Sequence, residues 1–150
     1  MREKVYKRKF LFFIRIFGNI MKTIKQEVKF GAIPHEVYEL LMDSKKHSGF
    51  TGEEAKISRE VGGKFSVYGG YAEGENLELI PDKKIVQKWR SEDWPEGHYS
   101  TVTFEFEESE EGCKLKFTQE NVPDENCKDI EEGWEDYYWK PMEEILGGNK

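Results

Sequence analysis

From residue 21 onward, apolar and polar positions alternate along most of the chain with the two-residue period of half-buried β-strands. The clearest run is 100–107, where Val102, Phe104 and Phe106 alternate with threonines and glutamates. Other strands are predicted over 24–30, 54–58, 64–68, 71–80, 84–90 and 113–120. Short turns rich in Gly, Pro and Asp separate most of these runs. We therefore expect about six to seven strands, joined mainly as an antiparallel meander.

Two stretches instead repeat apolar residues every three or four positions, as amphipathic helices do. The first begins at Pro34, whose missing N–H costs nothing in the first turn of a helix. Val37, Leu40 and Leu41 follow at helical spacing. Ser44 is a candidate cap for a short second helix that ends near Gly49.

The second helical stretch follows residue 126 and carries a wide, largely aromatic stripe. Its expected members are Ile130, Trp134, Tyr137, Tyr138, Pro141 and Ile145. Pro141 should kink or nearly end this helix and free the carbonyl of Tyr137. Because such a stripe needs an apolar partner, the sequence predicts an α+β fold, a curved antiparallel sheet around a long C-terminal helix.

Residues 1–20 differ from the rest, being basic and then aromatic. The apolar run 10–14 is much shorter than a transmembrane helix, and no clear secretory signal is present. A surface helix on a membrane is one alternative. We favour an extension outside the fold, of undefined role, followed by one domain over 21–150.

Charge limits the range of partners. The chain of 150 residues has a net charge of −7, but residues 1–20 carry six basic residues against one acid, and the remainder carries 17 against 29. A domain this acidic repels a phosphate backbone, so nucleic acid is not an expected partner. Cys113 and Cys127 match no metal or redox spacing, which is typical of a reducing compartment and favours a cytoplasmic protein.

Catalytic chemistry finds little support in the sequence. His35, His47 and His98 show no metal-ligand spacing, and the many carboxylates lie mostly on polar faces. The glycine pairs at 62–63 and 69–70 are interpreted as hairpin turns because no phosphate-binding context follows them. We expect no catalytic residue, no metal site and no cofactor.

The most distinctive segment is 88–99, KWRSEDWPEGHY. Trp89 and Trp94 are followed by a reversal at Pro95-Glu96-Gly97. Two tryptophans beside a turn either hold their own loop in place or form a binding face, and residue properties alone favour the first reading.

Several motifs together resemble one family, the C-terminal domain of the activators of heat-shock protein 90 ATPase, over residues 22 to about 146. Lys88–Tyr99 is the most specific match. The others are Pro34-x-x-Val37-Tyr38, Phe50-Thr51, Gly62-Gly63-Lys64-Phe65, Ile85-Val86, Thr101-Val102-Thr103-Phe104 and Gly133-Trp134-x-x-Tyr137-Tyr138. The resemblance implies the START-like, helix-grip fold. It also implies a non-enzymatic, co-chaperone-like protein that contacts heat-shock protein 90.

Full-length members of that family carry a separate N-terminal domain, which twenty residues are too few to supply. The expected partner surface shows an exposed apolar patch around Trp94 and comprises Trp89, Arg90, Trp94, Pro95, Glu96, Gly97, His98 and Tyr99. The alternative is a carrier or sensor of a small apolar ligand. It would use a cavity of several hundred Å³ between sheet and helix. The expected lining is Phe65, Trp89, Val102, Phe104, Phe106, Leu115, Phe117, Trp134 and Tyr138.

Overall fold

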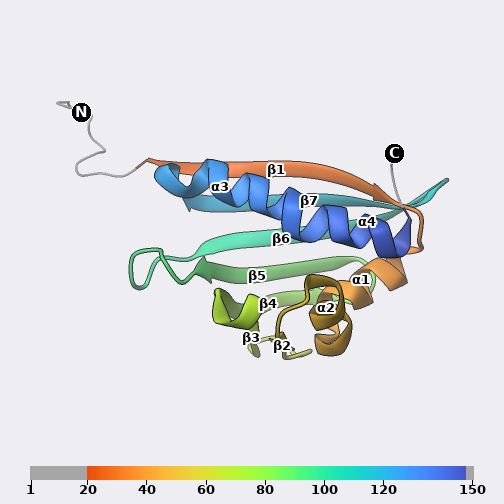
Figure 1. Cartoon of the computed structure of the whole chain (residues 1–150), viewed down its shortest axis with the longest axis horizontal. Helices are drawn as coiled ribbons and strands as arrows, with labels where there is room; N and C mark the ends of the chain where they lie inside the picture. The colour runs from red at the N-terminus through yellow and green to blue at the C-terminus, as the bar shows by residue number, and fades with distance from the viewer. Residues whose placement is uncertain (1–19, 148–150) are drawn as a thin grey trace.

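The computed structural model describes residues 20–147, which form one antiparallel sheet and a set of helices on its inner face (Figure 1). The seven strands are β1 Met21–Phe30, β2 Lys56–Ile57, β3 Lys64–Val67, β4 Ala72–Ile80, β5 Lys84–Ser91, β6 Ser100–Ser109 and β7 Gly112–Pro123. The spatial order is β1-β7-β6-β5-β4-β3-β2. The predicted meander is confirmed, and the first strand closes it by pairing with the last.

The pairing of β1 with β7 follows from their apolar faces. Ile24 lies opposite Gln119 and Val28 opposite Leu115, so buried positions of both strands point to the same side. The register shifts once, between Lys22 and Ile24. This pairing places Met21, the first residue of β1, beside Pro123, the last residue of β7, where the C-terminal helix begins.

Two short helices, α1 Pro34–Met42 and α2 Ser44–Thr51, connect β1 to β2. Pro34 occupies the first turn of α1, as predicted. The cap of α2 is Asp43, which accepts a hydrogen bond from the Lys46 amide, and α2 continues to Thr51 rather than ending near Gly49. Ser44 accepts the Ile57 amide at 2.8 Å instead, and so joins α2 to β2.

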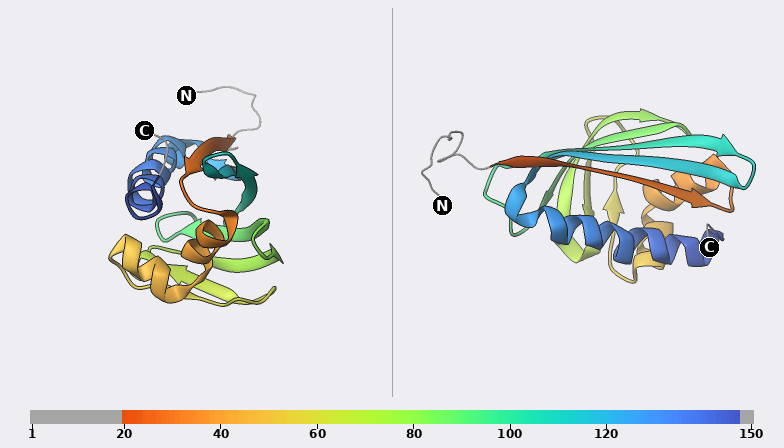
Figure 2. Two further views of the ribbon diagram at one scale, coloured as in Figure 1. Left: turned by 90° about the vertical axis from the view of Figure 1, so that its right-hand side faces the viewer. Right: turned by 90° about the horizontal axis from the view of Figure 1, so that it is seen from above.

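The C-terminal helix crosses the concave face of the sheet along most of its length (Figure 2). It consists of α3 Asp124–Trp134, a π-helical turn η2 Glu135–Trp139 and α4 Lys140–Leu146. Trp134, Trp139 and Met142 are buried against the sheet. The predicted helix-grip architecture, a curved sheet around a long C-terminal helix, is confirmed.

The predicted inner stripe of this helix is wrong at Tyr137 and Ile145, whereas Ile130, Trp134 and Tyr138 are buried as expected. Tyr137 and Ile145 are 60% and 58% exposed, whereas Trp139 and Met142 are fully buried. The cause is the π-turn, in which the Lys140 amide bonds to the Glu135 carbonyl and one extra residue enters the turn. The inward face therefore moves by one position after Trp134.

The loops also differ in part from expectation. Gly69 and Gly70 do lie in the turn of a hairpin, because β3 and β4 pair antiparallel up to Val67 and Ala72, but this turn contains a 3₁₀ turn, η1 Tyr68–Gly70, instead of a two-residue loop. Gly62 and Gly63 lie in the longer β2–β3 connection, where Gly62 has φ 84°.

The N-terminal prediction lies outside the described residues, except for exposed Ile20. Within residues 20–147, none of the helices has the length and apolar character needed to cross a membrane.

Candidate functional site

The tryptophan-containing connection between β5 and β6 projects from one end of the sheet (Figure 1). Trp89 and Trp94 are only 5% and 4% exposed, and their rings meet edge to face with centroids 5.4 Å apart. The expected exposed apolar patch around Trp94 is therefore wrong. The Trp94 amide bonds to the Ser91 carbonyl, and the Trp94 indole contacts both Trp89 and the His98 ring.

Hydrogen bonds hold this turn against neighbouring strands. The Arg90 guanidinium donates to the carbonyls of Trp94 at 2.8 Å and of Pro95 at 3.3 Å. His98 Nε2 lies 2.9 Å from the carbonyl of Asn121, and the Asn121 amide donates to the carbonyl of Tyr99. Because these bonds reach both β5 and the end of β7, the turn has a defined position on the sheet.

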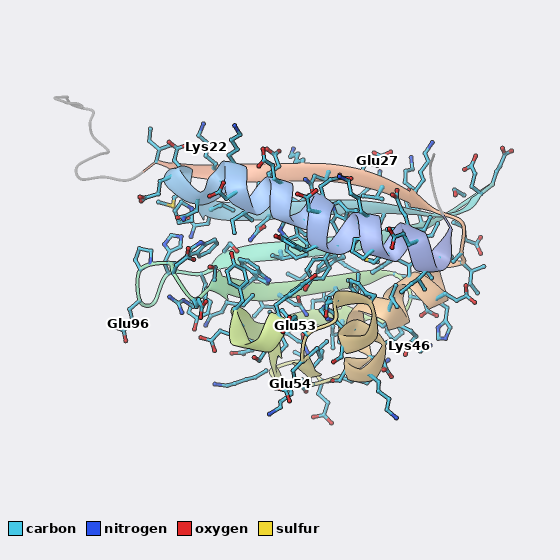
Figure 3. All side chains as sticks on the ribbon, in the orientation of Figure 1. Lys22, Glu27, Lys46, Glu53, Glu54 and Glu96 are labelled. Atoms are coloured by element: carbon cyan, nitrogen blue, oxygen red, sulfur yellow. The ribbon has the colours of Figure 1, made fainter. Side chains whose placement is uncertain are left out.

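The connection faces solvent at two places, at Glu92 and Asp93 and at its tip. Pro95, Glu96 and Gly97 form the tip, and Figure 3 shows Glu96 pointing away from the domain. At its base the Lys88 ammonium lies 4.6 Å from the centre of the Tyr99 ring. The tip is a small acidic, polar surface over a buried aromatic base.

A buried polar chain joins the C-terminal helix to the sheet beneath this turn. The Trp134 indole N–H donates to the Gln119 side chain at 2.8 Å, Gln119 donates to the Ser100 hydroxyl, and Ser100 donates to the Trp89 carbonyl. Sequence reasoning missed Gln119. The signal was available, because Gln119 occupies an inward position of β7 and a buried indole needs an acceptor.

A second polar contact, between His47 of α2 and Tyr138 of the helix, was also missed. The Tyr138 hydroxyl and His47 Nε2 are 3.0 Å apart, and both side chains are buried. Burial lowers the pKa of His47 to about 4 and raises the pKa of Tyr138 well above 10. Both groups are therefore neutral near pH 7, as a dry site requires.

The space between helix and sheet is much smaller than predicted for a ligand cavity. A cavity of about 20 Å³ lies beside Tyr138, with room for roughly one water molecule. Five of the predicted lining residues surround it: Phe65, Trp89, Phe104, Trp134 and Tyr138. The other four do not line it and pack in the core: Val102, Phe106, Leu115 and Phe117.

A larger open groove of about 840 Å³ lies beside this cavity, and the sequence did not reveal it. One wall is formed by α3 and η2 between Asp129 and Tyr138, and the other by η1, the start of β4 and the residues Thr51 and Glu53 at the end of α2. Its aromatic lining is Tyr68, Tyr71, Tyr137, Tyr138, Trp89 and Trp134, and its carboxylates are Glu53, Asp129, Glu132 and Asp136. Figure 3 shows Glu53 between η1 and α2.

The described part of the chain was predicted to hold no metal site and no reactive cysteine. Within residues 20–147, no three His, Cys, Asp or Glu side chains are placed to share a metal ion. Cys113 is buried, and burial raises the pKa of its thiol to about 11, so it is a poor nucleophile.

The seven-stranded curved sheet and its C-terminal helix define a protein of the START-like, helix-grip class. The chain belongs to the family described as activator of Hsp90 ATPase homolog 1-like proteins, whose family model matches residues 32–147.

The individual relatives agree with this assignment. The chain is 32% identical over 114 residues to the activator of 90 kDa heat shock protein ATPase homolog 1 of Homo sapiens, and 35% identical over 114 residues to the homolog of Dictyostelium discoideum. These matches cover 76% and 75% of the chain but only 34% and 30% of the relatives. The chain thus spans about a third of the length of these relatives.

A solved structure of similar size shares the fold. The crystal structure of an HSP90 activator from Plasmodium falciparum superposes with a TM-score of 0.78 at 32% identity, covering 85% of this chain and 97% of that one. The similarity therefore includes nearly the whole of a chain that consists of this domain.

Proposed function

We propose that the chain is a non-enzymatic, co-chaperone-like protein that binds heat-shock protein 90 and stimulates its ATPase. The observation that carries this proposal is the family membership, with about a third of positions identical over three quarters of the chain. The proteins that it resembles are named as activators of the ATPase and not as ATPases. A role by contact, in the cytoplasm where this chaperone class is expected, agrees with those names.

The surface proposed for the contact is the β5–β6 turn. Pro95, Glu96 and Gly97 form its exposed tip, and Trp89 and Trp94 support it from beneath. The partly buried side chains beside the tip are Arg90, His98 and Tyr99. The turn projects from one end of the sheet and its backbone is held by hydrogen bonds, so little ordering cost would accompany binding. In this proposal the tryptophans shape the surface instead of inserting into the partner.

Carriage of a small apolar ligand has less support. Such a ligand needs a pocket of several hundred Å³, and the cavity between helix and sheet measures about 20 Å³. The open groove is large enough, but four carboxylates along it disfavour a neutral apolar occupant.

The test is the ATP hydrolysis rate of the host's heat-shock protein 90 with increasing amounts of the full chain. We expect stimulation that saturates, and we expect Glu96→Lys to weaken it at least about fivefold in half-maximal concentration, since reversing a rim charge changes association. Glu96 is exposed, so this variant keeps the fold.

The matched control is Glu111→Lys, the same charge change on the exposed β6–β7 turn at the opposite end of the sheet. This variant should stimulate like the original chain. Equal loss in both variants would point to overall charge and reject the β5–β6 surface. No stimulation and no binding by the original chain would reject the co-chaperone function itself.

A further inference from the structure

The charged side chains that line the open groove beside the C-terminal helix are all acidic. Its lining contains four carboxylates and no Lys or Arg side chain. Asp136 pairs with Lys140 of the same helix, but within residues 20–147 no ion pair involves Glu53, Asp129 or Glu132. Unpaired acids on both walls favour an occupant with several positive charges.

The same groove is aromatic between its carboxylates. Tyr71 and Tyr137 are 40% and 60% exposed, and the Tyr68 ring contacts that of Tyr137 edge to face with centroids 5.9 Å apart. Tyrosine faces stabilise Lys and Arg through cation–π contacts and also bury apolar side chains. The complementary occupant is therefore a segment that is both basic and aromatic.

The chain itself contains such a segment. Residues 1–19 read MREKVYKRKFLFFIRIFGN, with six basic residues against one acid and a run of large apolar side chains at 10–14. The segment joins the domain at Ile20, whose carbonyl accepts a hydrogen bond of 3.0 Å from the Asp124 amide at the start of α3. It therefore joins the domain at the end of the helix that forms one wall of the groove.

The distances allow the segment to reach the groove. Asp129, the first groove residue on the helix, lies about 8 Å along α3 from Asp124 at 1.5 Å per residue. The five Cα–Cα steps from Ile20 back to Arg15 span about 17 Å when extended. A path that runs halfway around a helix about 10 Å across and about 8 Å along it has the same length, so residues up to Arg15 reach the groove.

We propose that residues 4–15 of this chain bind in the groove of the same molecule. The basic side chains contact Asp129, Glu132 and Asp136, and the apolar run packs against Tyr71 and Tyr137. The groove adjoins the base of the β5–β6 turn, where the Tyr71 carbonyl accepts the Glu92 amide at 2.8 Å, but none of the residues at the exposed tip of the turn lines it. This proposal rests on the groove alone and does not depend on the chaperone proposal.

Hydrogen–deuterium exchange of the full chain tests this binding. We expect amides within residues 4–15 to exchange at least about tenfold more slowly than in the free 19-residue peptide. Neutralising the groove with Asp129→Asn, Glu132→Gln and Asp136→Asn together should restore the exchange rate of the free peptide. The matched control, Glu131→Gln, Glu135→Gln and Glu144→Gln, removes three exposed acids of the same helix that do not line the groove and should keep the protection.

Salt provides a test without substitutions. At 1 M NaCl, where the screening length falls to about 3 Å, the original chain should lose most of the protection. Absence of protection in the original chain would overturn the proposal, and so would equal protection in the neutralised and control variants. Protection that rises with protein concentration would also overturn it, because the occupant would then be the segment of a second copy.

Discussion

The hydroxyl of Tyr68 donates a hydrogen bond of 2.5 Å to the backbone carbonyl of Tyr137. In a regular helix that carbonyl would accept the amide of residue 141, but Pro141 has none. Burial, with smaller electrostatic contributions from the neighbouring Tyr137 and Glu53 side chains, raises the pKa of Tyr68 to about 12, so its hydroxyl keeps its proton. A side chain from η1 therefore satisfies a carbonyl that proline leaves without a partner in the C-terminal helix.

Removing the Tyr68 hydroxyl should destabilise the domain only while Pro141 is present. Tyr68→Phe is expected to cost about 1 kcal/mol in the free energy of unfolding, because the Tyr137 carbonyl loses its donor. In a Pro141→Ala background the new amide supplies that donor, and the cost should fall by at least half. Urea unfolding of the two single variants and the double variant measures the coupling. Additive costs would mean that the two residues act independently.

Trp94 supports the turn from within, so its removal should affect stability first. Trp94→Ala is expected to lower the free energy of unfolding by about 3–5 kcal/mol, the usual cost of removing a buried large aromatic side chain. Pro95→Ala, one residue further on and exposed, should change it by less than about 0.5 kcal/mol. Chemical denaturation followed by circular dichroism separates the two. A cost under about 1 kcal/mol for Trp94→Ala would contradict the packed position of the indole.

Acid should weaken the fold through His47. Its pKa is about 4 when folded, below the usual 6.5 of the unfolded chain, so between these values the unfolded state binds more protons. The stability from neutral His47 is present in full above pH 6.5 and is lost as pH falls toward 4, on the order of 3 kcal/mol in all. The urea midpoint, measured between pH 4 and 7, should fall accordingly.

The His47→Gln variant isolates this effect. It lacks the titrating ring, so its urea midpoint should depend less on pH between 4 and 6.5, although it will be less stable near pH 7 because the contact with Tyr138 changes. The control is His35→Gln, at an exposed position on α1, which should retain the slope of the original chain. If His47→Gln also retains that slope, other groups govern the acid response.

The hydrogen bond from Trp134 to Gln119 should slow the exchange of one proton, the indole N–H of Trp134. Gln119→Leu leaves the buried Trp134 indole N–H without its acceptor, at a cost of about 1–3 kcal/mol. Glu120→Leu, the same type of change at the exposed neighbour, should cost less than about 0.5 kcal/mol. Nuclear magnetic resonance of the indole N–H should show faster exchange in Gln119→Leu only. Unchanged exchange would mean that packing alone protects this proton.

Much of the fold was predictable because it depends on local pattern. The alternation in 100–107 and in 113–120 defines strands with one buried face, and Pro34 marks a helix start wherever the chain lies in space. The apolar positions Ile130 and Trp134 likewise indicate a helix whose apolar side packs against another element of the fold. These signals need only near neighbours in sequence, so the helix-grip arrangement followed from them and from the family resemblance.

The site was less predictable because it depends on contacts between distant residues. The alternation of apolar and polar residues in β5 does not predict that Trp94 folds back over Trp89. Helical spacing likewise does not predict the π-turn, which buries Trp139 and leaves Tyr137 exposed. The pairing of His47 with Tyr138 joins residues 91 positions apart.

The amino-acid sequence by itself thus determined the strands, the helices, the acidic surface and the family. Each of these rests on residue type and periodicity. Only the tertiary structure decided that the helix–sheet interface is almost fully packed and that the open space lies in an acidic groove between η1 and α3. The volume left between two packed elements depends on the packing of all their side chains, and a local sequence pattern does not determine that volume.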